Sequence, residues 1–151
     1  MKTLSKILIV DDEPFNVDYL EQELEGSDYD IITATNGQDA LEKVRSEAPD
    51  LVLLDIMMPV IDGFTVLTQL KAEASSRDIP VVIISASNDL KNVVKGIQMG
   101  AEDYLPKPFE PTLLHARVSS SLEKKRLHDL QKLYLKSLER EFEIAREIQL
   151  S

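Results

Sequence analysis

Five short apolar runs alternate along the chain with longer segments that have the spacing of amphipathic helices. The runs are residues 6–10, 30–34, 51–54, 80–84 and 103–105. The first, third and fourth are apolar at nearly every position, which favours strands buried on both faces, as in a parallel sheet covered by helices. Strands that alternate with helices in this way are typical of repeated β-α-β units. The pattern therefore predicts an α/β fold with a parallel five-stranded sheet.

The segments between the runs carry helix signals. Pro14 suits the first turn of a helix that Gly26 ends, and Asn36 is a candidate N-cap for the next helix. Two further helices are expected near residues 63–70 and 90–99. The apolar residues that mark the helix after the first strand and the helix at 90–99 are Phe15, Val17, Leu20, Leu24, Leu90, Val93, Val94 and Ile97.

The last segment favours one long helix, since no Gly or Pro follows Pro111. A helix from there to Ser151 would span about 60 Å, and a packed domain needs only its first few turns. We therefore expect a first domain at residues 1–122 and a helical linker at residues 123–151.

Apolar residues of this linker form a coiled-coil-like seam with a discontinuity. They follow one another by three or four positions and are Leu127, Leu130, Tyr134, Leu138, Phe142 and Ala145. Because an isolated helix with so narrow an apolar stripe is marginal in water, we expect a homodimer through this helix or a connection to another domain. A frayed helical tail is the alternative.

Composition excludes several kinds of chemistry. The 151 residues contain no cysteine and only two histidines, which excludes disulfides, thiol nucleophiles and cysteine-ligated metal sites and disfavours a multi-histidine metal site. No apolar run reaches the roughly 18–20 residues of a membrane helix, and the first residues lack the pattern of a signal peptide. We expect a cytoplasmic protein without membrane contact.

The charge is unevenly distributed. Residues 1–122 hold 10 basic and 21 acidic residues, a net charge of −11, whereas residues 123–151 hold 7 and 6. An acidic first part argues against direct nucleic-acid binding, which needs a basic surface, and suits a site that binds cations.

Polar side chains stand where four predicted strands end. Asp11 and Asp12 follow the first strand, Asp55 the third, Ser85 the fourth, and Lys107 the fifth. In an open parallel sheet, ligands bind outside the carboxyl ends of the strands, so these groups should converge. Clustered carboxylates need a cation, and Mg²⁺ prefers such oxygen ligands. Asp55 could then attack phosphorus as a nucleophile, with the acid pair holding the metal and the lysine offsetting phosphoryl charge.

Each of these residues could also have a purely structural role. An aspartate at the end of a strand is often a turn residue or a helix N-cap, and Ser85 and Lys107 could be a turn hydroxyl and a surface lysine. Their joint occurrence at the ends of four strands makes coincidence improbable.

The sequence resembles the receiver domains of two-component response regulators over residues 4 to about 122. The resemblance rests on four stretches, which are Ile7-Leu8-Ile9-Val10-Asp11-Asp12-Glu13, Leu53-Leu54-Asp55-Ile56-Met57-Met58-Pro59 with Asp62-Gly63, Ile84-Ser85-Ala86, and Gly100-Ala101-Glu102-Asp103-Tyr104-Leu105-Pro106-Lys107-Pro108-Phe109. It implies a doubly wound, flavodoxin-like sheet with strand order 2-1-3-4-5.

The resemblance also implies a role for each site residue. Asp55 would accept a phosphoryl group from a histidine kinase or phosphotransfer protein. Asp12, Asp55 and the Met57 carbonyl would bind Mg²⁺ directly, with Asp11 acting through water. Lys107 would contact the phosphoryl oxygens.

Two further residues would act as a switch. Ser85 would move toward the phosphoryl group, and the Tyr104 ring would turn inward behind it. By position alone, an aromatic residue such as Tyr104 on a short strand more often has a packing role. The resemblance also implies a cis peptide bond between Lys107 and Pro108.

The linker and the acidic residues leave functional alternatives. The segment from Ala145 to Ser151 resembles those that lead into serine/threonine phosphatase domains, and the linker design also resembles receivers coupled to cyclases. The chain itself would catalyse at most its own phosphorylation and dephosphorylation. A Mg²⁺-dependent phosphohydrolase with an aspartate nucleophile is a second hypothesis, although Ile56 and Met57 supply no second acid. A phosphorylation-independent interaction domain is the third.

Overall fold

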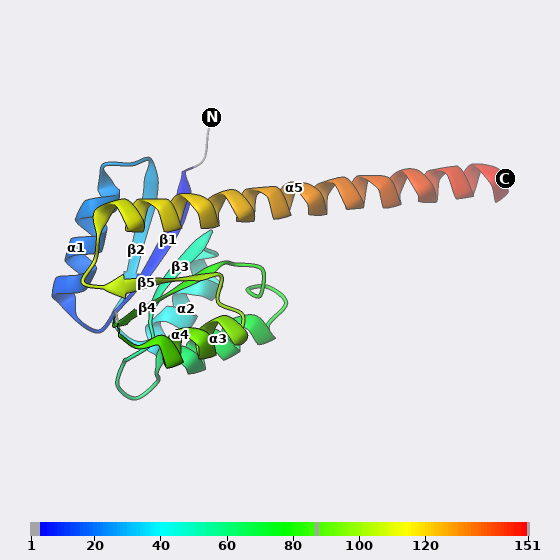
Figure 1. Ribbon diagram of the computed structural model, residues 1–151. Helices are drawn as coiled ribbons and strands as arrows, with labels where there is room; N and C mark the ends of the chain where they lie inside the picture. Colours follow the sequence, from blue (N-terminus) through cyan, green and yellow to red (C-terminus); the bar gives the residue numbers. More distant parts are fainter. Residues whose placement is uncertain (1–3, 87, 151) are drawn as a thin grey trace.

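The computed structural model describes residues 4–86 and 88–150, in which strands and helices alternate strictly (Figure 1). The strands are β1 (Ser5–Val10), β2 (Tyr29–Ala34), β3 (Leu51–Asp55), β4 (Val81–Ala86) and β5 (Asp103–Lys107). The helices are α1 (Pro14–Glu25), α2 (Gly37–Glu47), α3 (Gly63–Ala72), α4 (Leu90–Gln98) and α5 (Pro111–Leu150).

The five strands form one parallel sheet in the order β2-β1-β3-β4-β5, which confirms the predicted doubly wound fold. Sequence order and sheet order differ because the chain starts in the interior of the sheet and returns past β1 to form β3. β5 continues two residues beyond the predicted 103–105, and Ala86 is in register with Lys107. Lys107 is therefore the last residue of a strand rather than part of a loop.

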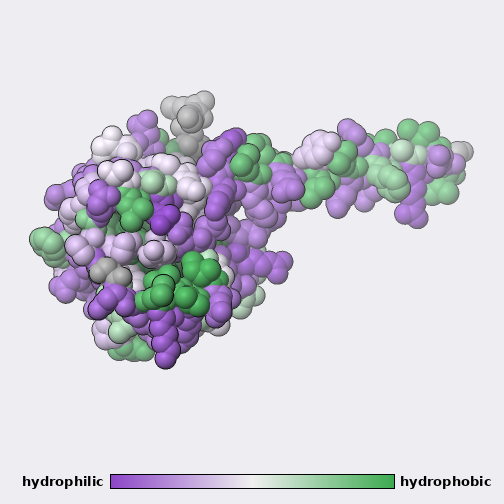
Figure 2. All heavy atoms as spheres, viewed as in Figure 1, coloured by the Kyte–Doolittle hydropathy of each residue, from purple (hydrophilic) through white to green (hydrophobic). Residues whose placement is uncertain are grey.

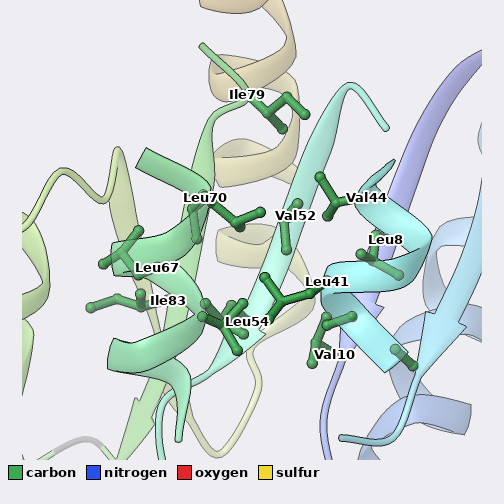
Figure 3. Close-up of a cluster of buried hydrophobic side chains, with 14 of the residues drawn as sticks. Leu8, Val10, Leu41, Val44, Val52, Leu54, Leu67, Leu70, Ile79 and Ile83 are labelled. Atoms are coloured by element: carbon green, nitrogen blue, oxygen red, sulfur yellow. The ribbon is translucent and has the colours of Figure 1, made fainter. Parts of the chain in front are cut away.

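Two apolar cores cover the two faces of the sheet. α2 and α3 pack on one face, where Leu41, Val44, Leu67 and Leu70 contact strand residues such as Leu54 (Figure 3). α1 and α5 cover the other face through a second cluster of buried side chains. Strand residues alternate between the two clusters, so the central strands are buried on both sides, as their unbroken apolar runs predicted.

Side-chain caps fix where two helices begin. The Asn36 carboxamide oxygen accepts a hydrogen bond from the Asp39 N–H (2.8 Å), and the Asp62 carboxylate accepts one from the Thr65 N–H (2.9 Å). Such caps satisfy backbone donors that have no partner within the helix. The second cap starts α3 just after the segment that carries Asp55.

Two predicted apolar faces are wrong in part. Phe15 in α1 is 77% exposed, and in α4 Leu90, Val94 and Ile97 are 72%, 46% and 42% exposed, although Val17 and Val93 are buried as predicted. Phe15 precedes Leu24 by nine residues, or two and a half turns, so it lies on the side of α1 opposite the buried Val17, Leu20 and Leu24. Apolar residues that are not on one stripe of a helix do not share its buried face.

α5 continues far past the sheet as a single helix (Figure 1). Leu114 and Val118 are buried against the sheet, whereas the apolar side chains from Leu127 onward are exposed. Figure 2 shows apolar and polar atoms interleaved along the part of the helix that extends beyond the body. The sequence predicts that this helix continues to Ser151, which lies outside the described residues. Within the described part of the chain, no helix is both long enough and apolar enough to cross a membrane.

Candidate functional site

The carboxyl ends of β1 and β3 bring three acidic side chains together. Asp11 and Asp12 directly follow β1, and Asp55 is the last residue of β3. One carboxylate oxygen from each of the three lies within 4.8 Å of the other two. The cluster forms because β1 and β3 are neighbours in the sheet and run in the same direction.

Asp11 has an unsatisfied carboxylate oxygen. The side chain is fully buried, and its Oδ1 accepts a hydrogen bond from the Glu13 N–H (2.9 Å). Its Oδ2 has no hydrogen-bond partner among the described residues, and the closest cation, Lys107 Nζ, lies 3.7 Å away. A buried carboxylate oxygen without a partner is costly, so the position suits a bound cation or a ligated water.

Asp55 is buried beside Asp11. It is 2% exposed, its Oδ1 accepts a hydrogen bond from the Met57 N–H (3.1 Å), and its Oδ2 lies 3.5 Å from Lys107 Nζ. Burial raises its pKa from 3.8 to about 6, an effect that the Met57 hydrogen bond and the Lys107 charge reduce and the Asp11 charge increases. The carboxylate is therefore ionised at neutral pH and held in a place that favours a nearby cation.

Asp12 and Met57 lie at the exposed rim of this cluster. The N-cap of α1 is Glu13, with Pro14 at the first helical position, so Asp12 does not serve as the N-cap that sequence reasoning kept as an alternative. Its carboxylate belongs to the three-acid group instead. Met57 is 66% exposed and follows Asp55 by two residues.

Lys107 is the one basic side chain that the structure places beside the acid cluster, within 4 Å of both Asp11 and Asp55. Its position at the end of β5 accounts for this, since β5 is separated from β3 only by β4. The peptide bond to Pro108 is cis, as the resemblance implied. One ammonium group faces three carboxylates, so the cluster keeps an excess of negative charge.

The two proposed switch residues, Ser85 and Tyr104, make no hydrogen bond to the cluster that the structure records. Ser85 is buried at the end of β4, and its hydroxyl donates to the Ala86 carbonyl (3.2 Å). Tyr104 in β5 is half-buried against the core on the α2–α3 side, with the Arg117 guanidinium 5.5 Å from its ring centroid. These positions are compatible with packing roles and with the predicted switch roles.

Sequence reasoning missed two features of the site. Gly63 is in contact with the end of β3, because a Cβ there would lie 2.4 Å from the Asp55 carbonyl oxygen. An apolar hollow beside Lys107, with a volume of about 310 Å³, is lined by Phe15, Tyr19 and Phe109. The sequence contained a sign of this hollow. Aromatic residues are few in this chain, and Phe15 and Phe109 each lie close to a site residue in the sequence.

Residues 7–119 match the response regulator receiver domain family, and the chain belongs to that family. Receiver domains of two-component systems are signalling modules rather than metabolic enzymes. They accept a phosphoryl group on an aspartate from histidine kinases or phosphotransfer proteins, and they bind Mg²⁺ at an acidic cluster.

Two curated relatives cover most of this chain. The alkaline phosphatase synthesis transcriptional regulatory protein PhoP of Bacillus subtilis is 43% identical over 117 residues, which is 78% of this chain and 48% of PhoP. The response regulator PleD of Caulobacter vibrioides is 43% identical over 116 residues, which is 77% of this chain and 26% of PleD. The chain thus spans less than half of the length of these curated relatives.

Solved structures agree with the fold. The receiver domain of NtrX from Brucella abortus superposes with a TM-score of 0.73 at 33% identity, covering 78% of this chain and 98% of that one. The chemotaxis response regulator CheY4 of Vibrio cholerae gives a TM-score of 0.74 at 26% identity, covering 79% of this chain and 99% of that one.

Proposed function

We propose that Asp55 is the residue that accepts the phosphoryl group from a histidine kinase or phosphotransfer protein. The observation that carries this proposal is the buried, partnerless oxygen of Asp11 beside the buried carboxylate of Asp55, with a single lysine facing both. An added cation would offset the repulsion among these carboxylates, and the group lies at the edge of the sheet where ligands bind.

Mg²⁺ is the cation that fits this donor set. Asp12, Asp55 and the Met57 carbonyl would hold it, with Asp11 acting through water, because Mg²⁺ favours one or two carboxylates together with water and phosphate oxygens. When bound, the ion offsets the negative charge of the phosphoryl oxygens and of the acid cluster. Lys107, within 4 Å of Asp11 and Asp55, would offset more of that charge.

Asp55 provides the nucleophile for phosphoryl transfer. One of its carboxylate oxygens forms the new bond to phosphorus while the bond from phosphorus to the donor atom breaks, and the electron pair of that bond stays with the donor. For a phosphohistidine the donor atom is an imidazole nitrogen, which is left neutral or takes a proton from solvent. Lys107 interacts with the transferred oxygens, and the Met57 N–H orients the attacking carboxylate.

A protein phosphodonor has a place to dock beside Lys107. Phe15 is largely exposed at the start of α1, and the Tyr19 and Phe109 rings stack with their centroids 5.6 Å apart in the adjoining hollow. Exposed apolar surface next to a charged site is typical of protein interaction sites. This surface would position the donor histidine over Asp55.

The linker would carry the signal to an output. We assign residues 1–122 to the receiver domain and 123–151 to a helical linker that forms a homodimer, because its seam residues Leu127, Leu130, Tyr134 and Leu138 are all at least 42% exposed. Phosphorylation would draw Ser85 toward the phosphoryl group and turn Tyr104 inward, which changes the surface next to α5. A phosphatase or a cyclase would be the regulated output, and the acidic receiver itself would not bind nucleic acid.

Phosphorylation by a small donor tests this proposal. Incubation of the chain with acetyl phosphate and Mg²⁺ should add the mass of one phosphoryl group, as measured by intact mass spectrometry, and the Asp55→Asn variant should stay unmodified. Chelation of Mg²⁺ should abolish labelling of the unaltered chain. Labelling of Asp55→Asn to the same extent would overturn the assignment, and sustained turnover of phosphoesters would favour a phosphohydrolase.

A further inference from the structure

Three basic side chains form a stripe on α5 just beyond the sheet. Lys124, His128 and Lys132 are spaced by four residues, so they lie on one side of the helix. Each approaches a carboxylate of the receiver body. The nitrogen–oxygen distances are 2.6 Å from Lys124 to Glu102, 3.5 Å from His128 to Asp78 and 2.5 Å from Lys132 to Asp78. We call these five residues the linker ion-pair cluster; its ion pairs are those of Lys124 and Lys132, and His128 lies beside Asp78.

The acidic partners lie on braced parts of the body. Asp78 is in the connection between α3 and β4, where Lys71 Nζ donates to the carbonyls on both sides of it, those of Arg77 (3.0 Å) and Ile79 (2.9 Å). Glu102 immediately precedes β5, and its N–H donates to a β4 carbonyl. The backbone at both residues is therefore fixed by the body, independently of the helix.

Electrostatic attraction, not apolar packing, acts between α5 and the body here. A hollow of about 310 Å³ lies beneath the cluster, and apart from Pro80 its lining side chains are all charged or titratable. The Lys132 ammonium group holds the pKa of Asp78 below its ordinary value, as expected for an ion pair. A single exposed pair contributes little, but two pairs that anchor the same helix to one rigid body act together.

The stripe and the dimer seam lie on different sides of the helix. At 100° per residue, the seam of Leu127, Leu130, Tyr134 and Leu138 is centred about a third of a turn away from the stripe. The cluster can therefore form while the seam stays available to a second helix.

We propose that the linker ion-pair cluster holds residues 123–132 of α5 against the receiver body and so fixes the direction in which the linker leaves it. The first turns of the linker then behave as part of the receiver, and the free helix begins only after Lys132. A movement at β5 would reach the linker through Glu102 and Lys124 as well as through the helix backbone.

Distance measurements on the full chain test this proposal. The chain has no cysteine, so Gln69→Cys in α3 and Lys136→Cys in α5 provide two spin-label sites, both at exposed positions. With labelled chains diluted in unlabelled protein, pulsed electron paramagnetic resonance should give one narrow distance distribution. The Asp78→Asn/Glu102→Gln variant should widen it about twofold, and amide exchange at residues 123–132 should be about threefold to tenfold faster.

A matched control separates this cluster from general effects of charge. Glu123→Gln removes a carboxylate whose partner, Arg126, lies on the same helix, so the distribution should keep its width. An unchanged width and unchanged exchange in the double variant would overturn the proposal, as would equal widening in Glu123→Gln. Because no phosphodonor is present, this outcome would not bear on phosphorylation of Asp55.

Discussion

At the scale of single residues, the buried carboxylate of Asp55 couples stability to pH. Its pKa in the folded protein, about 6, lies above the ordinary 3.8, so the folded protein binds more protons than the unfolded chain between these values. The free energy of unfolding should therefore fall as the pH rises from about 4 to about 7, by up to about 3 kcal/mol, when no divalent cation is present.

Urea denaturation across this pH range, with a chelator present, measures the effect. Asp55→Asn should remove the dependence and be more stable than the unaltered chain at neutral pH. Asp28→Asn, at an exposed position, should leave the pH profile unchanged. If the free energy of unfolding depended on pH in the same way in both variants, burial of Asp55 would not be the cause of that dependence.

Val60 is a second residue that lowers the stability of the fold, in this case through its backbone conformation. It has a φ of 67° and is fully exposed in the loop after the Asp55 segment. The left-handed region is unfavourable for a β-branched residue, and no burial compensates here. We expect Val60→Gly to raise the free energy of unfolding by about 1 kcal/mol, less than the full strain because glycine gains entropy in the unfolded chain.

Chemical denaturation of Val60→Gly and Val60→Ala distinguishes strain from other effects. The alanine variant keeps Cβ and should gain less than the glycine variant. A loss of stability in Val60→Gly would mean that the valine side chain makes a favourable contact that outweighs the backbone cost.

At the scale of elements, the approach of α3 to β3 requires a glycine. A Cβ at Gly63 would lie 2.4 Å from the Asp55 carbonyl oxygen and 2.5 Å from the Ile56 Cα, both backbone atoms that cannot rotate away. Gly63→Ala should therefore lower the free energy of unfolding by about 2 kcal/mol or more. It should also slow labelling of Asp55 by acetyl phosphate, because the displaced backbone carries that residue.

Gly26→Ala is the matched control, since a Cβ there has no heavy atom within 4 Å. Its denaturation midpoint should change little. If Gly63→Ala were equally tolerated, α3 could shift without cost and its first turn would not position the Asp55 segment.

The sequence predicted the elements of the sheet better than their surroundings. Unbroken apolar runs locate buried strands, because a strand covered on both faces has no polar position, and acids at their ends indicate a site. Strand order came from the resemblance alone, since local patterns do not encode which strands pair. The contact of Gly63 with Asp55 could not be predicted, because it depends on the distance between segments that are remote in the sequence. The exposure of Phe15 could have been predicted, because that residue is half a turn away from the buried face of its helix.

At the scale of the whole molecule, the site and the free helix lie at different places, and β5 and α5 connect them. Lys107 ends β5 beside Asp55, while Asp103 at its start forms an ion pair with Arg117 of α5 (3.1 Å). Arg117 also donates to the Tyr104 carbonyl (3.1 Å). A change at the acid cluster thus has a short physical route to the helix that would carry the output.

The seam on α5 should make the chain a dimer. Leu130 and Leu138 are both on the seam and exposed in the single chain, so replacing both with lysine should place charges in the interface and give a monomer by light scattering. Leu133→Lys is the control, because Leu133 is exposed to a similar degree but lies off the seam, and this variant should remain dimeric. Helicity by circular dichroism should fall in the double variant alone, since an unpaired helix frays.

Equal monomer masses for the unaltered chain and the double variant would contradict the predicted dimer. Dissociation in the Leu133 variant as well would show that a different face of the helix forms the interface.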